Sequence, residues 1–227
     1  MWKTVWDIGF TLSSFGATFV FGVAIGNLVQ GFPVDERGVY VGTLTGLFTF
    51  YSLATGAFAV VTFAMHGAMF LFLKTTGPVN ERLKRWIWHT WGLFLVVYIL
   101  VSMMTLIEHR HIIENVRRAP WAIPIVIVNV LCVANIPRAV FKGSFGQAFV
   151  CSCLNIACLV AIFMVSTFPN MIYSTSEHPS LTIYNAASSQ GTLWLMCIIA
   201  MIGVPLITAY TIIVYWTFRQ KIGEDDI

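Results

Sequence analysis

Six long apolar segments dominate this sequence, and each is long enough to cross a lipid bilayer as a helix. A helix rises about 1.5 Å per residue, so about 20 apolar residues cover a hydrocarbon core of about 30 Å. The segments predict an all-α, polytopic membrane helix bundle that forms a single transmembrane domain over residues 1–227. They run from Ile8 to Gln30, Leu47 to Leu73, Trp86 to Ile107, Trp121 to Phe141, Gly146 to Thr167, and Thr192 to Phe218.

Charged residues make up 10% of the 227 residues, whereas soluble domains average about 25%. Because so few charged side chains cannot cover a water-soluble globule, we expect lipid to be the main solvent. The net charge of +3 provides no dense basic face of the kind that binds phosphates. We therefore expect no nucleic acid among the partners.

The lysines and arginines are divided unequally between the two sides of the membrane. Six crossings place both termini on one side, together with nine of these residues, and leave four on the other side. The nine are Lys3, Lys74, Arg82, Lys84, Arg85, Arg138, Lys142, Arg219 and Lys221, and the four are Arg37, Arg110, Arg117 and Arg118. Because positive charge is retained on the cytoplasmic side, we predict that both termini are cytoplasmic.

Asp7 stands beside Trp6 at the cytoplasmic end of the first segment. An ionisable side chain within a membrane span is expensive and needs an explanation. One interpretation is a carboxylate at a helix N-terminus, which the exposed N–H groups and the helix dipole favour. The other interpretation is the entrance of a proton path, and both stay open.

His66 and His89 lie inside the second and third segments. In an antiparallel hairpin their depths in the membrane differ by about 6 Å, so a haem b held between the two imidazoles is one hypothesis. With such a haem, this protein would be a transmembrane electron carrier. The alternative is that each histidine donates a hydrogen bond to a carbonyl or hydroxyl of a neighbouring helix, with His89 facing the lipid headgroups.

Small and amide residues in the first segment indicate close packing. Gly16, Gly22 and Gly26 allow another backbone to approach, and the last two have GxxxG spacing. Asn27 and Gln30 follow at the outer end, where their amides can bond to a neighbouring segment or to a ligand headgroup.

The stretch from Glu108 to Glu114 holds two imidazoles and two carboxylates outside the membrane. Zinc could use such ligands, but Arg110, Arg117 and Arg118 oppose a cation, so we expect a solvated loop. The stretch from Phe168 to Gly191 is polar and carries Pro169 and Pro179. We expect it to pack along the outer surface or against a partner.

The sequence contains no Gly-rich phosphate loop and no GxSxG or HExxH motif. We therefore predict no catalytic and no metal-binding residues in this chain. A small polytopic transporter is an alternative function, and it would need broken helices at mid-membrane. The interruption that the sequence offers is Gly203 with Pro205, which predicts a kink in the last segment.

Four groups of residues, in this order and spacing, resemble subunit II of cytochrome bd-type quinol oxidases, including the cyanide-insensitive type. They are Trp6-Asp7 with residues 22–33; His66-Gly67-Ala68 with Leu73-Lys74-Thr75; Ser180-Leu181-Thr182 with residues 187–193; and the last segment with Pro205, Tyr210, Tyr215 and Trp216, ending in Lys221, Glu224 and Asp225.

The resemblance implies a complex of the bacterial cytoplasmic (inner) membrane that oxidises quinol and reduces dioxygen in aerobic respiratory electron transport. The haems b and d are then ligated by the partner, the haem-bearing subunit I. This chain is implied to be haem-free, to stabilise subunit I and to offer proton or oxygen access. A structural quinone or lipid and a small accessory subunit also fit the family.

Members of that family carry about three more helices before the Trp-Asp motif. This chain therefore resembles the C-terminal two thirds of such a subunit. A fragment, a mis-started gene and half of a split subunit are three explanations, and they stay open. The family motif includes Asp7, which strengthens its interpretation as a functional carboxylate.

Overall fold

The computed structural model describes residues 2–220 and contains seven α-helices and two short strands in that range. Lys221, Glu224 and Asp225 of the C-terminal motif lie outside the described residues. The helices are α1 (Trp2–Gln30), α2 (Phe50–Lys74), α3 (Pro78–Glu108), α4 (Arg110–Arg118), α5 (Ile123–Phe141), α6 (Phe145–Thr167) and α7 (Gln190–Thr217). Short 3₁₀ turns at Thr45–Leu47 and Pro120–Ala122 precede α2 and α5, and the strands are β1 (Asn170–Ile172) and β2 (Leu181–Thr182).

Six helices are long and apolar enough to span a membrane, which confirms the six predicted segments. The helix starts differ from the prediction because polar first turns extend beyond the apolar stretch. α1 begins at Trp2 and not at Ile8, and α3 begins at Pro78 and not at Trp86. Gly77, with a positive φ of 75°, turns the chain before Pro78, and proline suits the first position of a helix.

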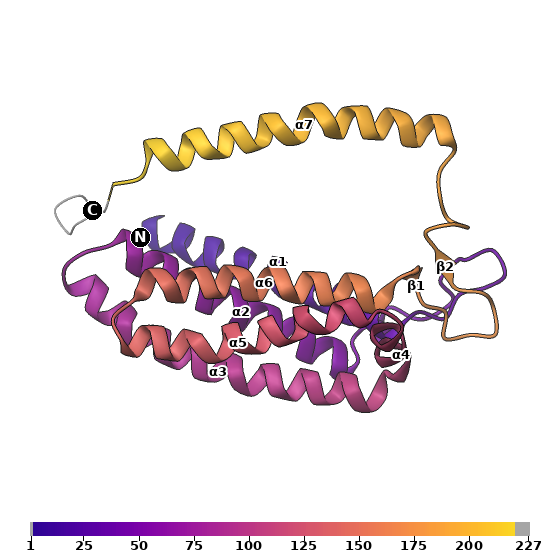
Figure 1. Cartoon of the computed structure of the whole chain (residues 1–227), viewed down its shortest axis with the longest axis horizontal. Helices are drawn as coiled ribbons and strands as arrows, with labels where there is room; N and C mark the ends of the chain where they lie inside the picture. Colours follow the sequence, from indigo (N-terminus) through magenta and orange to yellow (C-terminus); the bar gives the residue numbers. More distant parts are fainter. Residues whose placement is uncertain (1, 221–227) are drawn as a thin grey trace.

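The helices α2, α3, α5 and α6 form a four-helix bundle, and α1 packs along α2 (Figure 1). Each helix of the bundle contributes fully or almost fully buried apolar residues, such as Met65, Phe94, Ile136 and Ala148. The ring of Phe94 also stacks on Phe58 with their centroids 5.7 Å apart. The core therefore lies between these four helices.

Glycines hold α1 close to α2. A Cβ atom on Gly22 would lie 2.7 Å from the Cα of Gly56, and one on Gly26 would lie 2.9 Å from the Cα of Ser52. The prediction of close backbone approach is confirmed for these two glycines. It is wrong for Gly16, because a Cβ there would meet nothing within 4 Å.

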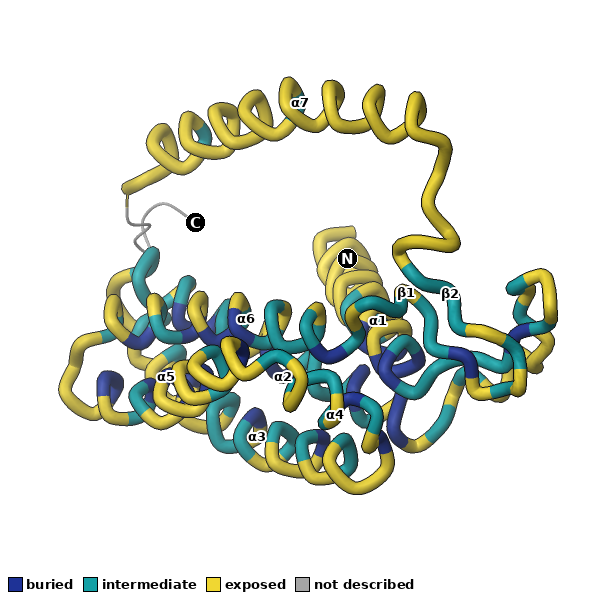
Figure 2. The backbone as a smooth tube through the Cα atoms, turned by 45° about the vertical axis from the view of Figure 1, so that its right-hand side comes forward, coloured by how far each residue is buried: buried dark blue, intermediate teal, exposed yellow. Residues whose placement is uncertain are grey.

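α7 lies apart from the other helices along most of its length (Figures 1 and 2). None of its residues is buried. It meets the bundle near its C-terminal end, where Tyr215 packs edge-on against Phe70 and Lys74 Nζ donates to the carbonyls of Phe218 and Arg219. The helix continues through Pro205, and Figure 1 shows an arch there and not a break.

The end of the bundle at which α1 ends and α2 begins is here called the outer end. It is covered by the segment after α6. β1 and β2 pair in antiparallel fashion, and Ser174 forms a bridge to Phe32, which follows α1. The packing of this segment on the end of the bundle is confirmed, and the outward orientation of that end stays a prediction. The prediction of a solvated loop from Glu108 to Glu114 is wrong, because α4 occupies most of it and both His109 and Ile112 are buried.

Candidate functional site

The structure brings three polar side chains together in the middle of the bundle. Tyr98 of α3 donates to Asn129 Oδ1 of α5 over 2.8 Å, and Asn129 Nδ2 donates to Asn155 Oδ1 of α6 over 2.9 Å. The two asparagines are 1% and 0% exposed. Such bonds join helices where no water is available. The sequence analysis missed this cluster, although asparagines inside apolar segments are a signal that could have located it.

His66 bonds to a neighbouring helix, as one of its two interpretations predicted. Its Nδ1 lies 2.8 Å from Ser152 Oγ of α6, and its ring stacks on Phe149 with centroids 4.9 Å apart. Ser152 Oγ also donates to the Phe149 carbonyl over 2.8 Å. Because a hydroxyl has one proton, the hydroxyl accepts from His66, which is therefore protonated on Nδ1.

His89 does not share this environment. It is exposed, and its Nδ1 lies 2.8 Å from the Arg85 carbonyl of its own helix, so it bonds within α3 and not to a neighbouring helix. The ring of His66 lies against α6, whereas His89 is on α3. This arrangement does not fit a haem held between these two imidazoles.

Asn27 and Gln30 bond to the chain itself. Asn27 Nδ2 donates to the carbonyls of Leu47 and Val23 over 2.8 and 2.9 Å. Gln30 Oε1 accepts from Thr49 Oγ1 over 2.6 Å. Since Leu47 and Thr49 precede α2 directly, both amides fix the outer end of α1 against the start of α2.

Asp7 is exposed on α1. The helix begins at Trp2, and its first turn holds no acidic residue. The interpretation of Asp7 as a carboxylate at the helix N-terminus therefore does not fit. Asp7 lies directly before the apolar segment that begins at Ile8, so its proposed role in a proton path stays a prediction.

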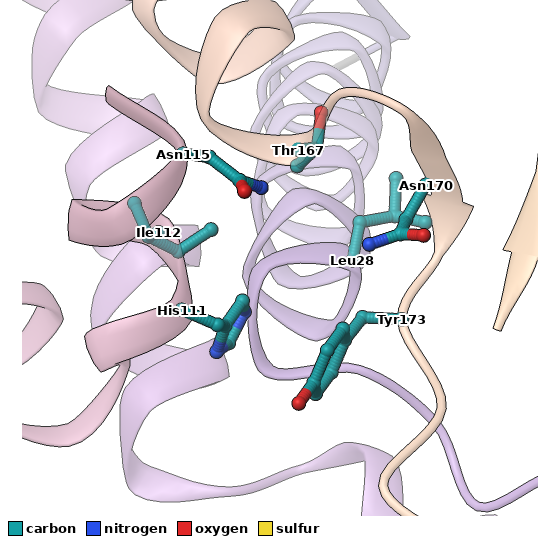
Figure 3. Close-up of a pocket in the computed structure, with 7 residues that line it drawn as sticks. All are labelled: Leu28, His111, Ile112, Asn115, Thr167, Asn170 and Tyr173. Carbon is teal, nitrogen blue, oxygen red and sulfur yellow. The ribbon is translucent and has the colours of Figure 1, made fainter. Parts of the chain in front are cut away.

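Two histidines, His109 and His111, pack between separate segments at the outer end of the bundle. The ring of His111 is stacked on Tyr173 at 4.2 Å with an interplanar angle of 2°, and its Nε2 lies 3.1 Å from the Val29 carbonyl (Figure 3). His109 is buried and packs edge-on against Tyr51 at 4.5 Å. Burial lowers the pKa of both imidazoles, so the fold favours their neutral forms.

Two cavities adjoin α4. A small one beside His111, also lined by Asn115 and Tyr173, encloses about 10 Å³, which is space for about one water molecule. A larger, mostly apolar groove of about 600 Å³ lies between the end of α6, Arg118 at the end of α4, and Trp121 in the 3₁₀ turn that follows. Within residues 2–220, no three His, Cys, Asp or Glu side chains come together as metal ligands.

Comparison with known families identifies the chain. The family described as cytochrome bd terminal oxidase subunit II matches residues 1–218. The chain belongs to this subunit II family. Its relatives include the cytochrome bd-I ubiquinol oxidase subunit 2 of Escherichia coli K12, which is 30% identical over 100% of this chain. The cytochrome bd ubiquinol oxidase subunit 2 of Bacillus subtilis is 26% identical over 99% of it.

A solved structure shows the same fold for this member of the subunit II family. The bd oxidase from Geobacillus thermodenitrificans matches with a TM-score of 0.69 and 17% identity over 92% of this chain. The chain spans 68% of the E. coli relative, 66% of the B. subtilis relative and 63% of the solved chain. These relatives therefore contain about one third more sequence of their own length than this chain covers. The six apolar helices and the family membership make this chain a multi-pass membrane protein.

Proposed function

We propose that this chain is a haem-free subunit of a membrane quinol:dioxygen oxidoreductase of the cytochrome bd type, acting in aerobic respiratory electron transport. The family match over residues 1–218 is the observation that carries this proposal. Residues 1–227 act as one transmembrane domain of the complex, located in the bacterial cytoplasmic membrane with both termini in the cytoplasm.

The proposed role of the chain is to stabilise the haem-bearing subunit I, which ligates haems b and d. The exposed apolar surface supports this role, because α7 buries none of its residues within residues 2–220. Large apolar surfaces of this kind mark contacts with another protein or with lipid. The ring of His66 lies against α6 and His89 is on α3, and this placement supports the haem-free state.

Two further roles are part of the proposal. Asp7 would lie on a proton route from the cytoplasm, and the chain would offer oxygen access to the haems of subunit I. The groove beside Arg118 and Trp121 would take a structural quinone or lipid, since its lining is mostly apolar and includes the cation of Arg118. A small accessory subunit would complete the complex.

The experiment compares the tagged chain made alone with the same chain purified in mild detergent from membranes of its own host. Alone, it should show no Soret band and no oxygen uptake. From its host it should carry a haem-bearing polypeptide in equal amount, with haem b and d absorption and quinol-dependent oxygen uptake. A Soret band in the chain alone that disappears in His66→Ala would contradict the haem-free role. Purification from the host without any haem protein would contradict the whole proposal.

A further inference from the structure

The small cavity beside His111 has the size that a single water molecule needs. It encloses about 10 Å³, and one buried water occupies a space of about 10–15 Å³. Residues of α1, α4 and α6 and of the stretch from Asn170 to Tyr173 form its wall (Figure 3). A side chain from outside residues 2–220 would need several times this space, so the cavity is not a gap left for another segment.

Two amide side chains reach this cavity from different elements. Asn115 comes from α4 and Asn170 from β1, and Figure 3 shows both side chains directed into the space between them. Both residues are half-buried. Asn115 Nδ2 donates to the Ser166 carbonyl over 2.8 Å, which leaves Asn115 Oδ1 as an acceptor. Among the described residues, no group bonds to this oxygen or to the side-chain amide of Asn170.

The other walls do not supply the missing hydrogen bonds. Leu28 and Ile112 are apolar. Thr167 Oγ1 donates to the Phe163 carbonyl over 2.9 Å, so its single proton is already used. His111 Nε2 lies 3.1 Å from the Val29 carbonyl and donates there. Polar groups left unpaired in a half-buried site cost free energy, so the two amides require a further partner.

Water fits this pair of amides better than an ion does. Asn115 Oδ1 needs a donor, whereas the amide of Asn170 offers both an acceptor and a donor. A water molecule donates and accepts at once, so it fits whichever way the Asn170 amide is turned. A metal cation prefers several oxygen ligands that include carboxylates, and the lining of the cavity contains no carboxylate.

We propose that one ordered water molecule occupies this cavity and bridges Asn115 Oδ1 to the side-chain amide of Asn170. The water ties α4 to β1 where the chain has just left α6. It lies beside the stack of His111 on Tyr173, which also joins α4 to the segment after α6. Asn115 lines the larger groove as well, so the bridge fixes the orientation of an amide in the wall of that groove.

The test is a structure of the full chain, purified from membranes of its own host, at a resolution that shows ordered water. We expect a density peak within about 2.7–3.2 Å of Asn115 Oδ1 and of one amide atom of Asn170. In Asn170→Leu, which has a similar size but cannot bond to water, this peak should be absent while other ordered waters at the outer end remain. An empty cavity, a direct bond between the two amides, or an unchanged peak in Asn170→Leu would overturn the proposal.

A second measurement keeps the test decisive if Asn170→Leu cannot be purified. Asn115→Ala and Asn170→Ala are combined in a double-mutant cycle on the equilibrium constant of unfolding. Because the two side chains do not bond to each other, only the shared water couples them, and we expect a departure from additivity of at least two-fold. The matched control cycle combines Asn115→Ala with Asn80→Ala, whose amide bonds to the Phe72 and Thr75 carbonyls at the opposite end of the bundle. That cycle should be additive, and equal coupling in both cycles or none in the first would overturn the proposal.

Discussion

His66 Nδ1 and Ser152 Oγ lie 2.8 Å apart and join α2 to α6 inside the bundle. Ser152 is fully buried and His66 is half-buried, so the serine hydroxyl cannot exchange this bond for one to bulk water. The serine hydroxyl also donates to the Phe149 carbonyl, and the bond therefore fixes both the orientation and the tautomer of the imidazole. The other nitrogen, Nε2, is left as an acceptor.

Ser152→Ala should destabilise the protein by about 1–3 kcal/mol, because the Nδ1–H group of the half-buried His66 loses its acceptor. The measurement is the thermal midpoint of the detergent-purified complex. Ser13→Ala is the matched control, since the Ser13 hydroxyl is exposed and bonds only within its own helix. Equal midpoints in the two variants would contradict the prediction.

The pair Asn129 and Asn155 should show measurable coupling across α5 and α6. Each single replacement by alanine leaves a buried amide without its partner, whereas the double replacement removes both. A double-mutant cycle on the free energy of unfolding should yield a coupling of about 0.6 kcal/mol or more, since interhelical bonds in membranes average about 0.6 and reach about 1.7 kcal/mol. Additive effects would show that the 2.9 Å contact contributes little.

Gly22→Ala should loosen the contact between α1 and α2. The added Cβ would lie 2.7 Å from backbone atoms of α2, so the helices must move apart at a cost of about 1–3 kcal/mol. Gly16→Ala is the control, because a Cβ there meets nothing within 4 Å. The midpoint of Gly22→Ala should fall well below that of Gly16→Ala, and the reverse order would count against this helix contact.

The outer end should weaken in acid. Burial lowers the pKa of His109 and His111 in the folded protein below the ordinary value, so the unfolded chain binds more protons. Stability is therefore fully present above the unfolded pKa of about 6.5 and is lost as the pH falls below it. The thermal midpoint should drop between pH 7.5 and pH 5.5.

The control for this pH dependence is His111→Phe, which retains a ring against Tyr173 but cannot titrate. Its midpoint should drop less than that of the unmodified protein between the same two pH values. A drop of the same size in both proteins would assign the effect to other groups.

Asp7→Asn tests the proposed proton route. If the carboxylate delivers protons, quinol oxidase turnover in the assembled complex should fall at least severalfold with haem content unchanged, because the amide cannot release a proton at neutral pH. Asp7→Glu should restore part of the turnover. A parallel loss of haem and of turnover would show that Asp7 serves assembly instead.

Much of the fold could be predicted because hydropathy and length alone identify membrane spans. The six helices and the close approach at Gly22 and Gly26 follow from patterns within one segment. The outer end could not be predicted in the same way, because its structure depends on contacts between distant parts of the chain. His111 packs on Tyr173, and Phe32 pairs with Ser174.

The candidate site shows the same division. His66 and Asn27 were located as polar residues within spans, but their partners Ser152 and Leu47 depend on how helices and connections meet. Asn129 was not singled out in the sequence, because its role depends on hydrogen bonds to Tyr98 and Asn155 on two other helices. One-dimensional patterns show which residues are unusual, and packing decides what they contact.

Because α7 is separate from the bundle, most of its side chains take no part in the packing of the other spans. No residue of α7 belongs to either apolar core cluster of the described chain, and none is buried. Apart from Tyr215, which packs against Phe70, the side chains of α7 can be replaced with little effect on the packing of the other five spans. The side chains of α7 must therefore suit a surface outside the described residues, whereas those of α2, α3, α5 and α6 must suit one another.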